Sequence, residues 1–152
     1  MKKLVTLIAA MAIFGAFYGA EASAQQRLLW KGGGGWGQGT PYARMYDPQS
    51  VETLSGVVVS VDQVTPMKGM ADGVHVMMET DTETISVHLG PSWYIENQDM
   101  TIEPTDQIEV TGSRITFEGE PAIIAAEVEK GDDVLVLRDA SGIPAWSGWR
   151  RR

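Results

Sequence analysis

The residues of this chain best suited to bind a ligand are its two histidines, His75 and His88, and three methionines that lie close to His75 in the sequence. Imidazole nitrogens bind copper and zinc, and thioether sulfurs select Cu(I). Met77 lies two residues after His75, and Met67 and Met70 precede it in the spacing Met-Lys-Gly-Met. Whether these side chains can meet depends on the elements that carry them.

The segment that contains both histidines has the pattern of a β-hairpin. Residues 73–90 read GVHVMMETDTETISVHLG, with a polar turn at residues 80–83. A turn centred on Asp81 and Thr82 pairs apolar residues with one another: Met78 with Ile85, Val76 with Val87, and Val74 with Leu89. On the other face, the same register places Glu79 opposite Thr84, Met77 opposite Ser86, and His75 opposite His88. Directly opposed residues have Cβ atoms roughly 4.5 to 5.5 Å apart, so both imidazoles could reach one ion.

This pattern therefore predicts a soft-metal site on the outer face of the hairpin, with copper as the favoured ion. Its ligands would be His75, His88 and Met77, with Met70 or Met67. Other interpretations stay open, because two histidines on a solvated sheet face also fit a polar surface, and methionines often fill gaps in a core. Acid-base catalysis by the pair is disfavoured, since no third group that would orient a histidine can be named.

A second candidate site lies at the C-terminus, where residues 140–152 read ASGIPAWSGWRRR. Trp146, Trp149, Arg150, Arg151 and Arg152 form an aromatic and basic tail on an acidic protein. Such a tail suits docking to an envelope protein complex or to a membrane surface. The alternative is that the two tryptophans pack back on the domain and the arginines stay solvated.

The composition excludes several classes of function. With 152 residues the chain forms one small domain, and because it has no cysteine it has no disulfide, thiolate metal site or cysteine nucleophile. It contains no nucleophile elbow, zinc-protease motif, phosphate loop or dinucleotide fingerprint. Carboxylates such as Glu127 with Glu129, or Asp132 with Asp133, are typical of a solvated face. We therefore expect a binding protein and not an enzyme.

The first 24 residues have the pattern of a cleavable signal peptide. Two lysines precede an apolar stretch over residues 4–20, and an Ala-Ser-Ala site follows at residues 22–24. This predicts export to the bacterial periplasm, with no transmembrane segment after cleavage. Removal of this segment leaves 10 basic and 19 acidic residues, a net charge of −9. Such a charge disfavours nucleic acid and favours cations or basic partners.

Residues 25–50 are rich in glycine, with aromatic residues at Trp30, Trp36, Tyr42 and Tyr46. We interpret this segment as a flexible tether, because glycine loses the most entropy on ordering and no continuous apolar face is present. The alternative is an aromatic arm that docks on a partner or on its own domain.

Residues 51–139 have the pattern of an all-β domain. Strands are expected at residues 51–64, 75–79, 84–89, 107–117, 122–129 and 134–137, with a short helix at residues 92–98 capped by Ser92. This order predicts a small five- to six-stranded OB-like Greek-key barrel with one short helix. The main competitor, an immunoglobulin-like sandwich, needs about seven strands.

Two stretches, GVVVSVD at residues 56–62 and ISVH at residues 85–88, are similar to sequences of known protein families. The chain resembles exported bacterial OB-fold proteins of uncharacterised function, and over residues 57–100 it is similar to the periplasmic copper and silver chaperones of Cus-type efflux systems. In those chaperones one His, two Met and a capping Trp bind the metal. The resemblance implies a ligand role for His88. Trp93 is not followed by the family's Trp-x-x-Met-x-Met run, so Met67, Met70 or Met77 would supply the thioethers.

Many OB-folds bind oligonucleotides or oligosaccharides on the second and third strands. In this chain the exposed face of those strands would show His75, Met77, Glu79, Thr84, Ser86 and His88, with no Lys or Arg. Proteins that bind single strands need a basic groove and aromatic platforms, so this face disfavours nucleic acid as a partner.

Overall fold

The structure is a computed structural model and describes residues 34–147. The predicted signal peptide, residues 25–33 and residues 148–152 lie outside this range. The elements follow in the order η1 (Ala43–Met45), η2 (Pro48–Ser50), β1 (Val51–Val64), β2 (Gly73–Glu79), β3 (Thr84–Pro91), α2 (Ser92–Ile95), β4 (Gln107–Phe117), β5 (Glu120–Lys130) and β6 (Asp133–Val136). None of the helices in this range is both long enough and apolar enough to span a membrane.

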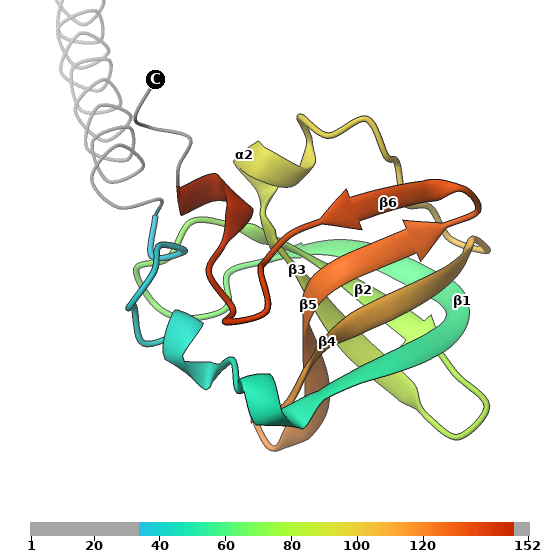
Figure 1. Cartoon of the computed structure of the whole chain (residues 1–152), viewed down its shortest axis with the longest axis horizontal. Helices are drawn as coiled ribbons and strands as arrows, with labels where there is room; N and C mark the ends of the chain where they lie inside the picture. The colour runs from blue at the N-terminus through green and yellow to red at the C-terminus, as the bar shows by residue number, and fades with distance from the viewer. Residues whose placement is uncertain (1–33, 148–152) are drawn as a thin grey trace, which may run out of the picture.

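Five of the strands close into the predicted OB-like barrel (Figure 1). β2 and β4 pair antiparallel with the two halves of β1, β3 pairs with β2, and β5 pairs with β4. A parallel pairing of β3 with β5, at Ser86–Ala122, Val87–Ile123 and His88–Ile124, closes the ring. β6 pairs with the end of β5 and extends the sheet there. The all-β class is confirmed.

β1 serves both halves of the barrel because it is long and bends sharply. Residues 51–57 pair with β4 and residues 57–64 with β2, with a register shift between Val58 and Ser60. Such a bulge increases local twist and bends the strand. Gly56 lies at the bend, where a Cβ atom would clash with the carbonyl oxygen of Glu79 on β2. Glycine is therefore required for the close approach of the two strands.

The glycine-rich segment is a packed arm within the described residues, so its interpretation as a flexible tether is wrong for residues 34–50. Trp36 is 1% exposed, and Tyr42 and Tyr46 are also buried. Trp36 Nε1 donates to the carbonyl of Ala71 at 2.9 Å, and Trp146 Nε1 donates to the carbonyl of Trp36 at 2.8 Å. The burial of three large rings offsets the entropy that the glycines lose on ordering. Residues 34–50 are therefore an aromatic arm that docks on its own domain.

The helix α2 begins at Ser92, as expected, but Ser92 is not its N-cap. The N-cap is Pro91, and no side chain there accepts a hydrogen bond from the first turn. The helix ends after Ile95, where the Ser92 carbonyl accepts from the Glu96 backbone N–H and the Tyr94 carbonyl from that of Asn97. α2 crosses one end of the barrel (Figure 1).

Candidate functional site: a buried histidine pair and an acidic outer face

His75 and His88 are directly opposite one another on β2 and β3, as the sequence predicts. Their rings stack, with centroids 3.8 Å apart and planes inclined by 6°. The prediction that they lie on a solvated face is wrong, because they are only 6% and 1% exposed. The Phe117 ring stands edge-on to the His88 ring at 4.9 Å, and the Tyr42 ring lies parallel to it at 6.0 Å. The face is covered by β4 and by the arm.

Burial keeps both imidazoles neutral. Desolvation lowers the pKa of His75 to about 4, against an opposing effect of Asp62. Desolvation also lowers the pKa of His88 to about 3, and the charges of His75 and Arg138 lower it further. His88 Nδ1 shares a 2.8 Å hydrogen bond with the Tyr42 hydroxyl, whereas the buried Nε2 of His75 has no hydrogen-bond partner. At neutral pH the pair is a polar but uncharged cluster beneath the arm.

This geometry limits how the pair can bind a metal. The nitrogen lone pairs lie in the ring planes, so those of two parallel rings do not converge on a single ion. Within residues 34–147 there is no group of three or more His, Cys, Asp or Glu side chains that could hold a metal ion together. Both histidines can ligate one ion only if a ring turns away from the stack.

The structure does not bring all the predicted methionine ligands into the histidine cluster. Met77 is half-buried on β2 and lies opposite Ser86. Met67 and Met70 are partly buried and pack against the hydrophobic core. Met70 lies beneath Gly35 of the arm, because a Cβ atom added to Gly35 would lie 2.6 Å from the Cγ atom of Met70. For Met67 and Met70 a packing role therefore accounts for the observed positions.

Trp146 does not present its ring to a partner, because it is 3% exposed and packs on the domain. This corrects its prediction as a docking residue and agrees with the alternative in which the tryptophan packs back. Its ring contacts Tyr94 with centroids 5.3 Å apart, and the Arg138 guanidinium lies 4.8 Å from its centroid. Trp149, Arg150, Arg151 and Arg152 lie outside the described residues.

Arg138 is buried, although nothing in the sequence predicts this, because a lone arginine after the last strand carries no signal of burial. Its Nη1 donates to the carbonyls of Leu89 and Ala125. Desolvation lowers its pKa to about 10, while Tyr42 and Tyr46 oppose that shift. Arg138 therefore stays charged at neutral pH and links β3, β5 and the segment that holds Trp146.

The outer face of β1, β4, β5 and β6 carries carboxylates between exposed valines. Pairing aligns Ser55 with Glu109, Glu109 with Glu129, and Glu129 with Val134 across the four strands. Val134 and Val136 on β6 are 54% and 53% exposed, and Val57 on β1 is also exposed. We call this surface the valine–glutamate face; it comprises Val57, Glu109, Glu127, Glu129, Val134 and Val136.

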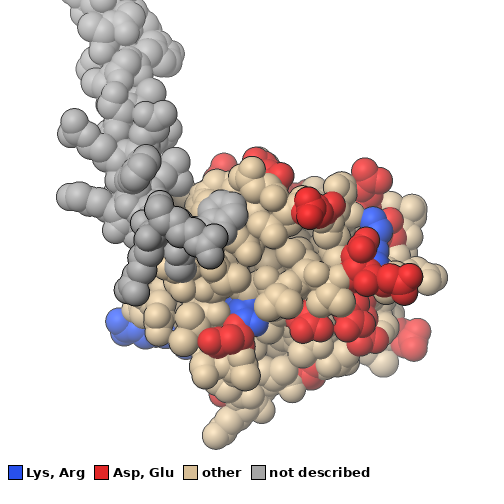
Figure 2. All heavy atoms as spheres, turned by 45° about the horizontal axis from the view of Figure 1, so that its top comes forward, with Lys and Arg blue, Asp and Glu red and all other residues tan. Residues whose placement is uncertain are grey.

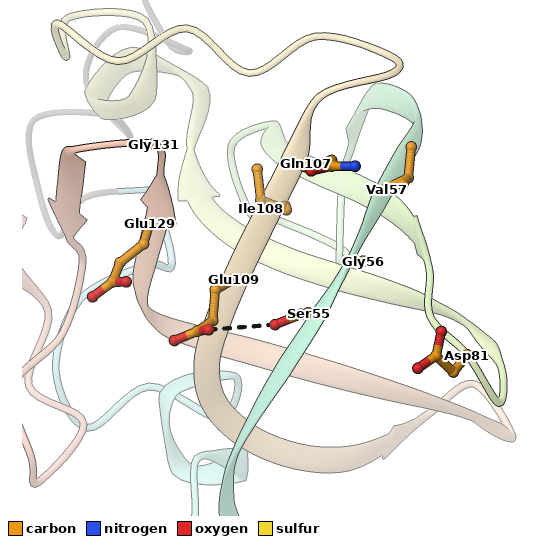
Figure 3. Close-up of a pocket in the computed structure, with 9 residues that line it drawn as sticks. All are labelled: Ser55, Gly56, Val57, Asp81, Gln107, Ile108, Glu109, Glu129 and Gly131. Carbon is orange, nitrogen blue, oxygen red and sulfur yellow. Dashed lines mark hydrogen bonds between the residues drawn. The ribbon is translucent and has the colours of Figure 1, made fainter.

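An open groove of about 470 Å³ crosses this face and includes Val57, Glu109 and Glu129. Glu109 and Glu129 extend to the same side from neighbouring strands, and Ser55 Oγ donates to Glu109 Oε2 at 3.3 Å (Figure 3). Asp81 adds a third carboxylate to the lining, which contains no Lys or Arg. The arrangement favours a cationic or hydrogen-bond-donating ligand with apolar surface.

The charge of the described domain agrees with this preference. Residues 34–147 contain 19 acidic and five basic residues, a net charge of −14. Three of the basic side chains are engaged: Arg114 pairs with Glu52 and Glu83, Lys130 pairs with Asp106, and Arg138 is buried. In Figure 2 acidic side chains outnumber basic ones and gather towards the right-hand side of the view.

Comparison with known proteins places the chain in a family. No curated protein matches the sequence. Residues 50–135 match the model of the MamS/MamX magnetosome protein family. The match runs from the start of β1 into β6 and includes both histidines and most of the valine–glutamate face. Since it spans 86 of the 152 residues, the chain belongs to the MamS/MamX magnetosome protein family.

Proposed function

We propose that this protein is an exported, non-enzymatic binding module of a magnetosome-associated assembly, and that it docks a basic protein partner on the valine–glutamate face. The observation that carries the proposal is the direct opposition of Glu109 and Glu129 between exposed valines. Like charges directly opposite one another destabilise a sheet. A cationic partner would remove that repulsion on binding.

The distribution of exposed apolar side chains supports docking at this face. Of eight exposed large hydrophobic residues in the described range, three belong to this face: Val57 on β1 and Val134 and Val136 on β6. Contiguous exposed apolar patches commonly mark interaction sites, whereas isolated ones are ordinary. Valines at both edges and glutamates between them fit a partner with basic residues flanked by apolar ones.

The test uses a synthetic probe, the heptapeptide Lys-Val-Lys-Val-Lys-Val-Lys, titrated into ¹⁵N-labelled protein. We expect saturable amide shifts on β1, β4, β5 and β6, and binding that weakens as salt is raised. Glu109→Lys with Glu129→Lys should weaken binding about tenfold or more, since each change replaces an attraction by a repulsion. Glu118→Lys, in the β4–β5 turn, makes the same charge change as either single substitution but lies outside the face, so it is the control for Glu109→Lys and Glu129→Lys taken one at a time. Equal weakening by Glu118→Lys, or shifts scattered over the whole domain, would contradict the proposal.

The same face gives a prediction about stability. Glu129→Lys should raise the free energy of unfolding by about a few tenths of a kcal/mol, because it converts a repulsive cross-strand pair with Glu109 into an attractive one. Urea unfolding of the variant and of Glu118→Lys measures the difference. A variant that gains stability while it loses peptide binding shows that the face is maintained for binding. A Glu129→Lys variant that is less stable than the wild type would show that Glu109 and Glu129 do not repel one another in the folded protein.

A soft metal ion, with copper favoured, is a second candidate ligand. The observation that favours it is the buried Nε2 of His75, which has no hydrogen-bond partner. Anaerobic competition for Cu(I) should show one-to-one binding tighter than micromolar that is lost in His75→Ala/His88→Ala. Met45→Leu, a methionine outside the predicted ligand set, is the control. No binding, or binding unchanged in a folded double variant, would remove metal from the proposed functions.

A further inference from the structure

A second pocket lies at one end of the barrel, away from the valine–glutamate face. Its volume is about 390 Å³, within the range of about 300 to 1,000 Å³ usual for small-ligand sites. β1, β2, β3, α2, β6 and the α2–β4 loop all contribute to its wall. No residue of this pocket lines the groove on the valine–glutamate face, so the two are separate sites.

The floor of the pocket is apolar. Leu89 on β3, Val74 on β2 and Leu135 on β6 are buried and form part of its lining. Ile102 and Met100, which are partly buried, complete the apolar wall from the α2–β4 loop. Apolar walls with a few polar groups at the rim are typical of ligand pockets.

The polar groups of the pocket lining define the charge of its occupant. Asp62 and Glu96 are exposed carboxylates, and the lining contains no Lys or Arg. Gln63 Nε2 donates to Glu96 Oε1 at 2.9 Å, which links β1 to the end of α2. Lys130 donates to the carbonyl of Thr101 beside the pocket, but it is paired with Asp106 at 2.8 Å. Carboxylates around an apolar cavity favour a cationic head group and repel an anionic one.

We propose that this pocket binds a small organic amine, with its apolar body against Ile95, Met100 and Ile102, above the buried floor, and its ammonium group at Asp62 and Glu96. Burial of the apolar body supplies affinity, and the two carboxylates supply selection by charge. The proposal does not depend on the docking of a protein partner, because it uses different residues.

The experiment compares two probes with the same phenylethyl skeleton and opposite charges, 2-phenylethylamine and 3-phenylpropionate. Each probe is titrated into protein comprising residues 25–152 that is labelled at the Ile, Leu and Val methyl groups. Binding is followed by the NMR shifts of those methyl groups. We expect saturable shifts at Leu89, Leu135 and Ile102 with the amine, and binding of the carboxylate that is about tenfold weaker or undetectable. Equal affinities would overturn selection by charge, and shifts confined to other methyl groups or no saturable shift with either probe would overturn the site.

Variants separate the two parts of the proposal. Asp62→Asn/Glu96→Gln removes both charges from the rim and leaves the interior unchanged, so we expect the preference for the amine to fall about tenfold while the protein stays folded. Ile102→Trp fills the cavity and should abolish binding of both probes. Glu103→Gln, a neighbouring exposed glutamate outside the lining, is the control. An amine preference that survives Asp62→Asn/Glu96→Gln would overturn the assignment of the head group.

Discussion

A Trp36→Ala variant is expected to lose about 3 to 5 kcal/mol of its free energy of unfolding. The indole is 1% exposed and packs edge-on against Tyr42 and Trp146, with ring centroids 4.8 and 6.3 Å away. Its Nε1 also donates to the carbonyl of Ala71, so truncation leaves both a cavity and an unsatisfied acceptor. Urea unfolding monitored by far-UV circular dichroism measures the loss.

The control for this prediction is Trp93→Ala, which removes a half-buried tryptophan from α2. We expect a smaller loss there, because less apolar area is exposed on truncation. A loss below about 1 kcal/mol for Trp36→Ala would mean that the arm is not part of the cooperatively folded unit.

Mild acid should destabilise the protein, because its two buried histidines are neutral in the folded state. The pKa values of His75 and His88 are lowered from 6.5 to about 4 and about 3 in the folded state. The unfolded chain therefore binds protons near pH 6.5 while the folded chain does not, so stability is complete above pH 6.5 and falls as the pH drops towards 4. Each histidine contributes about 1.4 kcal/mol per pH unit over that range.

This prediction is tested by urea unfolding between pH 7 and pH 5, where carboxylates of ordinary pKa stay ionised. We expect the free energy of unfolding to fall steadily across this window in the wild type. In His75→Gln/His88→Gln, which keeps polar side chains at both positions, the fall should disappear. A wild-type stability that does not change between pH 7 and pH 5 would show that the imidazoles are protonated as easily in the folded as in the unfolded chain.

Local patterns predicted much of the fold. The observed bounds of β1 and β4 equal the expected ranges, and the register of the β2–β3 hairpin is correct for five pairs from Glu79–Thr84 to His75–His88. The pair Val74–Leu89 is wrong, since a shift between Val74 and His75 places Val74 opposite Gly90. Alternation and turn chemistry act over a few residues, which is why the sequence reveals them and not the irregularity at the end of the hairpin.

The surroundings of the predicted site could not be inferred in this way. His75 and His88 follow the alternation of an outward face, yet Tyr42 reaches His88 from 46 residues away and Phe117 covers it from β4. The valine–glutamate face arises from pairings across β1, β4, β5 and β6, so its charge cluster appears only once the register is known. Both features depend on contacts between segments distant in sequence, which periodicity does not encode.

The hydrogen bond between Trp146 and Trp36 joins residues 110 positions apart. When only the first strands have left the ribosome, this hydrogen bond cannot form, because Trp146 has not yet been synthesised. The parallel pairing of β3 with β5 likewise cannot form until β5 has been synthesised. The loops between such residues must close before the native contacts can stabilise the folded state. Closure of long loops costs entropy, and this slows folding. The emerging polypeptide therefore completes its core only after nearly all of it has been synthesised, and until then its apolar strands are open to chaperones.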